Sequence, residues 1–317
     1  MTGSRKHQGT IVAFLVVAAL LLLALATGAC GRGEASDAET PIRVVLIPAD
    51  GGTASGTLAD YRPLFDTLSR STGMRFELTI TQSYGAAVEG ICNGVADLAF
   101  VGPATYLQAR DRGCAQLLAV GIKNGQPRYY AAFFVRSDAP LRGLADLAGK
   151  RVAFGDINST SSFLMPVAML MEARLDPARD LSAVRLTGSH PNSLNALLQG
   201  QVDAAALSLD SYDRALRAGV PGAEKLRVLA RSEAMPYPPF IVSTRLPAAR
   251  REILREGFSR LAQDAAITQG RITGYGGGAI EGYATHFSDA PFDSMARRIA
   301  RVTPALKAAL LERAAQQ

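Results

Sequence analysis

The feature that most constrains the fold is an internal repeat, in which one short block of sequence recurs in the second half of the chain. Residues 93–106 align without gaps to residues 199–212, and Gly, Asp, Ala and Tyr fall at matching offsets. Each block predicts a helix that ends at Gly, a turn through Asp into a buried strand, and the start of another helix. The alternative explanation is chance or the general similarity of α/β sequences. The repeat favours two related α/β units.

Strand and helix patterns alternate around these blocks. A β-branched run from Ile42 to Ile47 is followed by helical spacing of apolar side chains in 59–72 and by strand composition in 76–81. This order is typical of largely parallel sheets flanked by helices. Residues 151–155 take the place of the first strand in the second unit. We therefore expect an α/β fold of two lobes whose strand ends face one another across a cleft.

The two lobes are predicted to be interleaved in the sequence. Strand-like runs at 130–135 and 240–243 lie on either side of the second unit, so the chain crosses there and returns. We expect lobe one to comprise residues 42–135 and 240–317, and lobe two to comprise residues 136–239. Two crossings of this kind can form a hinge, because a few residues at element ends absorb the rotation of closure.

The N-terminus has the pattern of an export signal. Arg5 and Lys6 precede an apolar run from Ile11 to Ala26, and small residues then lead to Cys30. The run is shorter than the ~20 apolar residues of a spanning helix, although an uncleaved membrane anchor is the alternative. We expect residues 1–29 to be a signal peptide and the small, polar residues 30–41 to be a flexible tether.

The residues before Cys30 also resemble the bacterial lipoprotein signal, in which the cysteine carries the lipid. Thr27 departs from the Leu usual at that position. The expectation is a protein that is exported to the periplasm or cell surface and attached to a membrane through Cys30.

Composition excludes several classes of function. The apolar fraction of 48% and charged fraction of 20% exclude a disordered chain. The 34 basic residues against 28 acidic ones are scattered, whereas a nucleic-acid-binding protein gathers them into a patch. Three Cys and three His leave little room for a metal site, so we expect no metal, no cofactor and no nucleic-acid partner. Cys92 and Cys114 are either a disulfide or two buried thiols.

A run of hydroxyl side chains carries the chemistry. Ser159, Thr160 and Ser161 follow the strand at 151–155 and precede an apolar helix. The amides of a first helical turn lack intrahelical acceptors, and the helix dipole places partial positive charge there. Hydroxyls beside such amides form a site for a compact oxyanion. Simple capping of the helix is the alternative, but several consecutive hydroxyls exceed what a cap requires.

His190 is the second candidate, because it follows the strand at 183–186, at the edge where open α/β sheets bind ligands. We expect it to donate a hydrogen bond to an anion and to titrate near neutrality. A surface or structural histidine is the alternative. Nothing in the sequence predicts a convincing hydrolase: no Gly-x-Ser-x-Gly motif is present, and Ser161 with His190 is a weak dyad.

Together these motifs resemble the phosphonate-, phosphite- and phosphate-type substrate-binding proteins of ABC importers. The resemblance covers Ile42 to Phe287 and is carried by residues 154–161, 165–166 and 187–190 and by the block at 200–204. It implies the two-lobed periplasmic-binding-protein fold with a hinge. It also implies that a phosphorus oxyanion is held from lobe two by Ser159, Thr160, Ser161 and His190.

The same resemblance implies further ligand contacts. Tyr84 matches a cleft tyrosine of lobe one, and a second falls at Tyr129 or Tyr130, with Tyr129 favoured. Asp210 matches an acidic residue that accepts a ligand proton or meets an amine. The family's aminoalkylphosphonate binders carry another acidic residue in the stretch corresponding to 235–239, and here there is none. This departure favours a smaller, less cationic ligand, such as phosphite, phosphate or a short alkylphosphonate.

The expected function is capture of the anion by hinge closure and its delivery to an ABC permease in the membrane, without catalysis. We expect a monomer, as is usual for such binding proteins. The alternatives are an exported phosphoester hydrolase with His190 as acid or base, and a sensor subunit that presents its ligand to a signalling partner.

Overall fold

The computed structural model describes residues 40–48 and 53–316, and the described residues from 41 onward form one compact unit. The predicted signal peptide, the predicted lipid attachment site Cys30 and the predicted tether up to residue 39 lie outside the described residues. Among the helices that are described, none combines the length and apolar character needed to cross a membrane.

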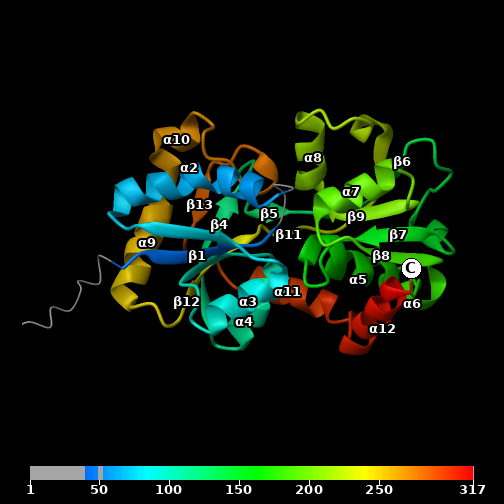
Figure 1. Cartoon of the computed structure of the whole chain (residues 1–317), viewed down its shortest axis with the longest axis horizontal. Helices are drawn as coiled ribbons and strands as arrows, with labels where there is room; N and C mark the ends of the chain where they lie inside the picture. Colours follow the sequence, from blue (N-terminus) through cyan, green and yellow to red (C-terminus); the bar gives the residue numbers. More distant parts are fainter. Residues whose placement is uncertain (1–39, 49–52, 317) are drawn as a thin grey trace, which may run out of the picture. The chain divides into compact units, whose positions relative to one another are not determined.

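The first sheet has six strands in the order β13-β4-β12-β3-β1-β2. Strands β3, β1 and the edge strand β2 are parallel, whereas β12 and β13 run antiparallel to their neighbours. Figure 1 shows α2 on one side of these strands and α3 and α4 on the other. The strands are β1 Ile42–Leu46, β2 Phe76–Ile80, β3 Leu98–Phe100, β4 Ala115–Ile122, β12 Pro239–Ser243 and β13 Gly282–Ala284; the helices are α2 Ala54–Thr72, α3 Tyr84–Cys92, α4 Pro103–Asp111, α9 Ala248–Arg260 and α10 Ala265–Thr268.

The second sheet has five strands in the order β10-β6-β9-β7-β8. Strand β7 is parallel to β8 and β9, and β6 is antiparallel to β9 and β10. The strands are β6 Ala131–Arg136, β7 Arg151–Phe154, β8 Ala183–Leu186, β9 Ala204–Ser208 and β10 Leu226–Arg231; the helices are α5 Met165–Glu172, α6 Pro177–Asp180, α7 His190–Leu198 and α8 Leu209–Arg217. The predicted α/β fold with two sheets is confirmed, and we refer to the two sheets with their helices as lobe one and lobe two.

The internal repeat is confirmed as a structural repeat. The block at 93–106 joins α3 to β3 and α4, and the block at 199–212 joins α7 to β9 and α8. Its aspartates have the same role in both lobes. Asp97 accepts hydrogen bonds from the backbone and guanidinium of Arg43 at the start of β1, and Asp203 accepts the same set from Arg151 at the start of β7.

The chain crosses between the sheets twice, in the segments just before β6 and just before β12, and the two crossings are paired with each other. Strand β5 (Arg128–Tyr129) and strand β11 (Met235–Pro236) form an antiparallel two-stranded ribbon. The first crossing follows β4, and the second leads into β12. This ribbon is the candidate hinge.

Two segments that were predicted to belong to lobe one pack against lobe two instead. Strand β6 was placed in lobe one up to residue 135, but it pairs with β9 and β10 in the second sheet. The C-terminal helix α12 (Pro304–Ala315) was also placed in lobe one, but it packs on β8 and α6, and its Arg313 donates to carbonyl oxygens of Ala178 and Leu181. Helix α11 (Ala290–Ile299) precedes it and contacts both α4 and α5.

The question left open for Cys92 and Cys114 is settled in favour of a disulfide. It joins the last residue of α3 to the residue before β4. It therefore fixes the end of the helix whose first residue is Tyr84.

Candidate functional site

The predicted hydroxyl-lined bend follows β7 and opens with a capped turn. The Ser159 hydroxyl accepts from the Ser162 amide at 3.2 Å, and a single π-helical turn at Thr160–Leu164 leads into α5. A Cβ atom on Gly155 would lie 2.2 Å from the Ser162 hydroxyl, so the bend requires glycine there. The side chains of Ser159 to Ser162 are buried.

The bend faces lobe one. The Thr160 hydroxyl accepts from the Ala104 amide, in the first turn of α4, at 2.8 Å. The Asp156 carboxylate accepts from the Tyr84 amide, at the start of α3, at 3.2 Å. The N-termini of two lobe-one helices thus meet the start of the lobe-two helix at one place. Each N-terminus contributes backbone donors and partial positive charge, which suits an anion.

Two ionisable groups that the sequence did not single out lie beside the bend. Burial raises the pKa of Asp156, although its hydrogen bonds from the Asn158 and Tyr84 amides oppose that shift. The Lys307 ammonium, from α12, donates to the Asn158 side-chain oxygen at 3.0 Å, and burial lowers the pKa of Lys307. The bend therefore has a cation nearby, which we had not expected.

His190 begins α7 and is held by hydrogen bonds at both ring nitrogens. Nδ1 accepts from the Ser208 amide at 3.2 Å, so the neutral ring carries its proton on Nε2, which lies 2.8 Å from the Tyr275 hydroxyl. Burial lowers the pKa of His190 to about 3. The expected titration near neutrality is therefore wrong: an imidazole enclosed on every side has no solvation for its charged form.

Tyr275 was missed by the sequence analysis. It comes from lobe one, in the segment between α10 and β13, and its ring is buried. The residue after it, Gly276, has φ 74° and lies against α8, where a Cβ atom would be 2.7 Å from the Asp210 carbonyl oxygen. A tyrosine within the glycine-rich run 274–278 is the signal that marks this close approach in the sequence.

Tyr129 and Asp210 line one cavity of about 350 Å³, together with Lys123 and Tyr130. Tyr129, in β5, is buried, and its ring centroid is 5.8 Å from that of Tyr275. Asp210, in the first turn of α8, forms an ion pair with Lys123 of lobe one. Burial raises the pKa of Asp210, and the Lys123 ammonium opposes that rise.

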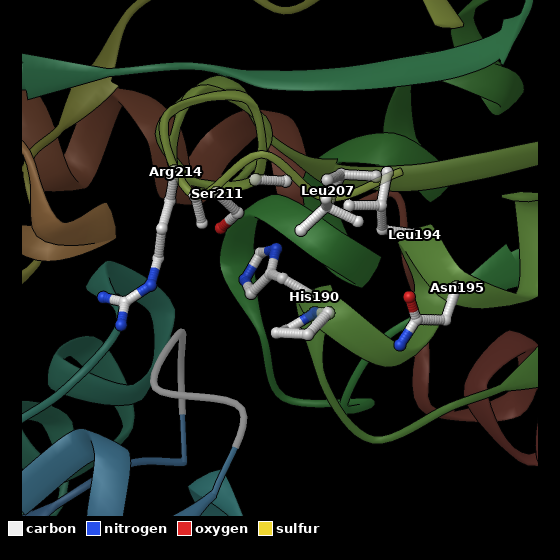
Figure 2. Close-up of a pocket in the computed structure, with 10 residues that line it drawn as sticks. His190, Leu194, Asn195, Leu207, Ser211 and Arg214 are labelled. Atoms are coloured by element: carbon white, nitrogen blue, oxygen red, sulfur yellow. The ribbon is translucent and has the colours of Figure 1, made fainter. Parts of the chain in front are cut away.

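Two further cavities adjoin the predicted residues. One of about 170 Å³ lies between α7 and α8; Figure 2 shows Leu194 and Leu207 on one side of the His190 ring and Arg214 on the other. Another of about 320 Å³ is lined from both lobes, by Thr81 and Gln82 after β2 and by Thr187 and Ser189 after β8. Its lining mixes hydroxyl and amide side chains with apolar ones and contains no charged residue.

The predicted site residues thus fall into two groups, and contacts link the members within each group. Ser159, Thr160 and Ser161 lie at the bend, to which Asp156 ties Tyr84. His190, Tyr129 and Asp210 form the second group, which Tyr275 and the start of α8 join. Within residues 40–48 and 53–316, no group of three or more His, Cys, Asp or Glu is arranged to hold a metal ion.

Comparison with known sequences gives consistent matches. The family model of the periplasmic substrate-binding protein of phosphonate ABC transporters matches residues 52–278. The phosphate-import protein PhnD of Mycolicibacterium smegmatis is 34% identical over 214 residues, which cover 63% of this chain and 65% of that protein. The phosphonates-binding periplasmic protein of Escherichia coli is 26% identical over 186 residues, which cover 57% of this chain and 55% of that protein. The chain matches less than two thirds of the length of each relative.

Solved structures show the same fold. A binding protein component of an ABC phosphonate transporter from Pseudomonas aeruginosa has a TM-score of 0.74 at 20% identity, covering 88% of this chain and 97% of that one. PhnD1 from Prochlorococcus marinus, in complex with methylphosphonate, has a TM-score of 0.72 at 18% identity, covering 82% and 97%. The family model spans more than half of the sequence, and the fold agrees with it. The chain therefore belongs to the family of periplasmic substrate-binding proteins of phosphonate-type ABC transporters.

Proposed function

We propose that this chain captures a small phosphorus oxyanion outside the cytoplasm and delivers it to the permease of an ABC importer. The observation that carries the proposal is the meeting of helix N-termini and buried hydroxyls at the Ser159–Ser161 bend. Such a site binds a compact oxyanion through uncharged donors. The printed names of the relatives, which concern phosphate and phosphonates, support the same class of ligand.

The proposed roles divide between the lobes. Ser159, Thr160 and Ser161 hold the anion from lobe two, and Tyr84 covers it from lobe one. His190 stays neutral and offers its Nε2 proton, now directed at Tyr275, as a donor. Because the ring is neutral, His190 contributes a hydrogen bond and no charge; the positive charge nearest the bend is the Lys307 ammonium, which donates to the Asn158 side-chain oxygen.

The ligand is proposed to be phosphite, phosphate or a short alkylphosphonate. Residues 235–239 hold no acidic side chain, and Met235 and Tyr237 there are buried. A positively charged substituent on phosphorus would find no partner in that stretch. Small, anionic ligands avoid this cost.

Capture is proposed to proceed by closure. The anion binds first at the bend, and lobe one then excludes water, which strengthens every hydrogen bond inside. Hydrogen bonds to charged groups contribute roughly 1.5–3 kcal/mol each. A handful of such hydrogen bonds sustains micromolar affinity, about −8 kcal/mol, after the costs of ordering.

The family is one of solute-binding proteins rather than enzymes, so the hydrolase alternative is not favoured. A sensor role finds no supporting observation.

Calorimetry with phosphite, phosphate and methylphosphonate tests the proposal. We expect at least one of these anions to bind the wild-type protein with micromolar or tighter affinity. The Ser159→Ala/Thr160→Ala double variant should bind it at least roughly tenfold more weakly, the effect of losing one charged hydrogen bond. Ser259→Ala, on the exposed face of α9, is the matched control and should not change affinity. Unchanged binding in the double variant would refute the site.

We also propose that the chain is exported as a monomer and attached to a membrane by a lipid on Cys30. The small residues before Cys30 and the polar stretch after it support this. A single acyl chain holds a protein weakly, whereas the several chains of a lipoprotein hold it firmly. Cys30→Ser should therefore move the protein from the membrane fraction to the soluble fraction. Equal membrane retention of both forms would contradict lipid anchoring.

A further inference from the structure

The ion pair between Lys123 and Asp210 joins the two lobes beside the residues proposed to bind the ligand. Lys123 follows β4 of lobe one, and Asp210 lies in the first turn of α8 of lobe two. The Asp210 side chain is 6% exposed and that of Lys123 is 19% exposed. A carboxylate buried to this degree requires a cation, because an unpaired charge there is strongly destabilising. Lys123 supplies that cation from within the chain.

Lys123 is held in place by a tight turn. Its backbone N–H and C=O both pair with Gln126, and the two residues between them, Asn124 and Gly125, have φ of 52° and 67°. This is the backbone of a two-residue hairpin turn that requires positive φ at both central positions. The Gly125 amide also donates to the Glu281 carboxylate at 2.8 Å. The backbone that carries Lys123 is therefore held by hydrogen bonds within the turn and to Glu281.

The ion pair is linked to the proposed anion site in two ways. Asp210 is two residues after Ser208, whose amide donates to His190 Nδ1. Tyr129 lines the same cavity as Lys123 and Asp210, and its ring packs on Tyr275, whose hydroxyl lies 2.8 Å from His190 Nε2. A substituent that extends from a phosphorus atom held near His190 toward Tyr129 would therefore approach Asp210.

We propose that Lys123 is a specificity-determining residue. Its ammonium takes the place at Asp210 that the amino group of an aminoalkylphosphonate would take, so the protein discriminates against ligands that carry an amine. Such a ligand must displace Lys123 and then lie beside its charge. Phosphorus oxyanions without an amine leave the pair intact. This inference rests on the proposed function, and it narrows the ligand class within it.

The other charges around this cavity do not replace Lys123. Arg128 and Asp213 also line it. Arg128 is exposed, whereas the ion pair of Asp210 is with Lys123. The substitution Arg128→Met is therefore a suitable matched control, because it removes a positive charge from the same cavity and leaves the partner of Asp210 in place.

The test compares two ligands that differ only by an amine, ethylphosphonate and 2-aminoethylphosphonate, by calorimetry. The quantity of interest is the ratio of the dissociation constant of the amine to that of ethylphosphonate. We expect a ratio above about ten for the wild type and a fall of at least tenfold in Lys123→Met, the order of effect of a charge pair in a water-poor site. Arg128→Met should leave the ratio within about twofold, and Lys123→Met/Asp210→Asn should not show the fall.

Asp210→Asn gives a second, independent reading, because it leaves Lys123 uncompensated and should raise the ratio. If thermal unfolding shows that Lys123→Met does not fold, the ratio measured for Asp210→Asn serves as the test of the inference. A wild-type preference for the amine, an unchanged ratio in folded Lys123→Met, or a ratio that fails to rise in Asp210→Asn each overturns the inference while leaving the proposed function intact. Failure of the wild type to bind ethylphosphonate, methylphosphonate, phosphite or phosphate overturns both.

Discussion

At the scale of single residues, the most informative side chain is the buried imidazole of His190. Its hydrogen bonds to the Ser208 amide and the Tyr275 hydroxyl fix both the ring and its proton. A neutral donor of this kind costs less to bury than a charged one. We therefore expect the ionisation of His190 to change the free energy of unfolding with pH rather than the affinity for the ligand.

We predict a pH-dependent stability that is specific to His190. In the unfolded chain the imidazole titrates near pH 6.5, whereas burial lowers its pKa in the folded state to about 3. Between these values the unfolded state holds the extra proton, so stability is lost as the pH falls through this window. Urea unfolding of the wild type and His190→Asn should show a free-energy difference that shrinks below pH 6.5, by at most about 1.4 kcal/mol per pH unit. A difference that stays constant from pH 7 to pH 4 would contradict this assignment.

Which residues could be predicted from the sequence depends on how local their partners are. The Ser159–Ser161 bend is a local pattern, so its position at a helix start was predictable. Tyr275 and Lys307 meet His190 and Asn158 across separations of 85 and 149 residues, and single-sequence patterns carry no information about such pairs. The depressed pKa of His190 was unpredictable for the same reason, because it follows from the surroundings that the fold assembles.

At the scale of elements, local patterning predicted most of the strands and helices but not every strand pairing. The aspartates of the repeat, Asp97 and Asp203, were visible because they fall at the same offset in each block, and each pairs with the arginine at the start of β1 or β7. Strand β6 was assigned to the wrong sheet, because a uniformly apolar run is compatible with the interior of either one. The docking of α12 on β8 depends on contacts of Arg313 with distant carbonyl groups, and these leave no periodic signal.

The Cys92–Cys114 disulfide gives a prediction at this scale. It closes a loop of 22 residues that includes α4, which restricts the unfolded chain. Replacing both cysteines by alanine should lower the free energy of unfolding by about 3 kcal/mol, as measured by urea denaturation. Reduction of the wild type should reproduce the loss, and reduction of the double variant should add nothing. A loss below about 1 kcal/mol in both experiments would show that the bridge does not stabilise lobe one.

At the scale of the whole molecule, the proposed closure depends on contacts that span the two lobes. Besides the bend and the Lys123–Asp210 pair, Arg214 of α8 contacts Asp60 of α2 at 2.7 Å. The side chains of this pair are 28% and 27% exposed, so water and salt weaken it. It should support the closed form only modestly.

We predict that Asp60→Asn weakens the affinity for the best phosphorus oxyanion less than about fivefold, as expected for a partly exposed pair. The effect should fade in 0.5 M salt, because screening shortens the reach of exposed charges to a few ångströms. Asp138→Asn breaks an exposed pair with Arg136 inside lobe two and is the control, with no change in affinity expected. A loss above tenfold that persists in high salt would show that this pair holds the lobes together more strongly than its exposure implies.

The paired crossing strands also restrict how the molecule opens. Because β5 and β11 are hydrogen-bonded to each other, neither strand can slide or turn without the other. A two-stranded ribbon bends across its face more easily than it distorts within the plane of its hydrogen bonds. We therefore expect opening to be a swing about a single axis, so that ligands of different size change the angle at which the swing stops and leave its direction unchanged.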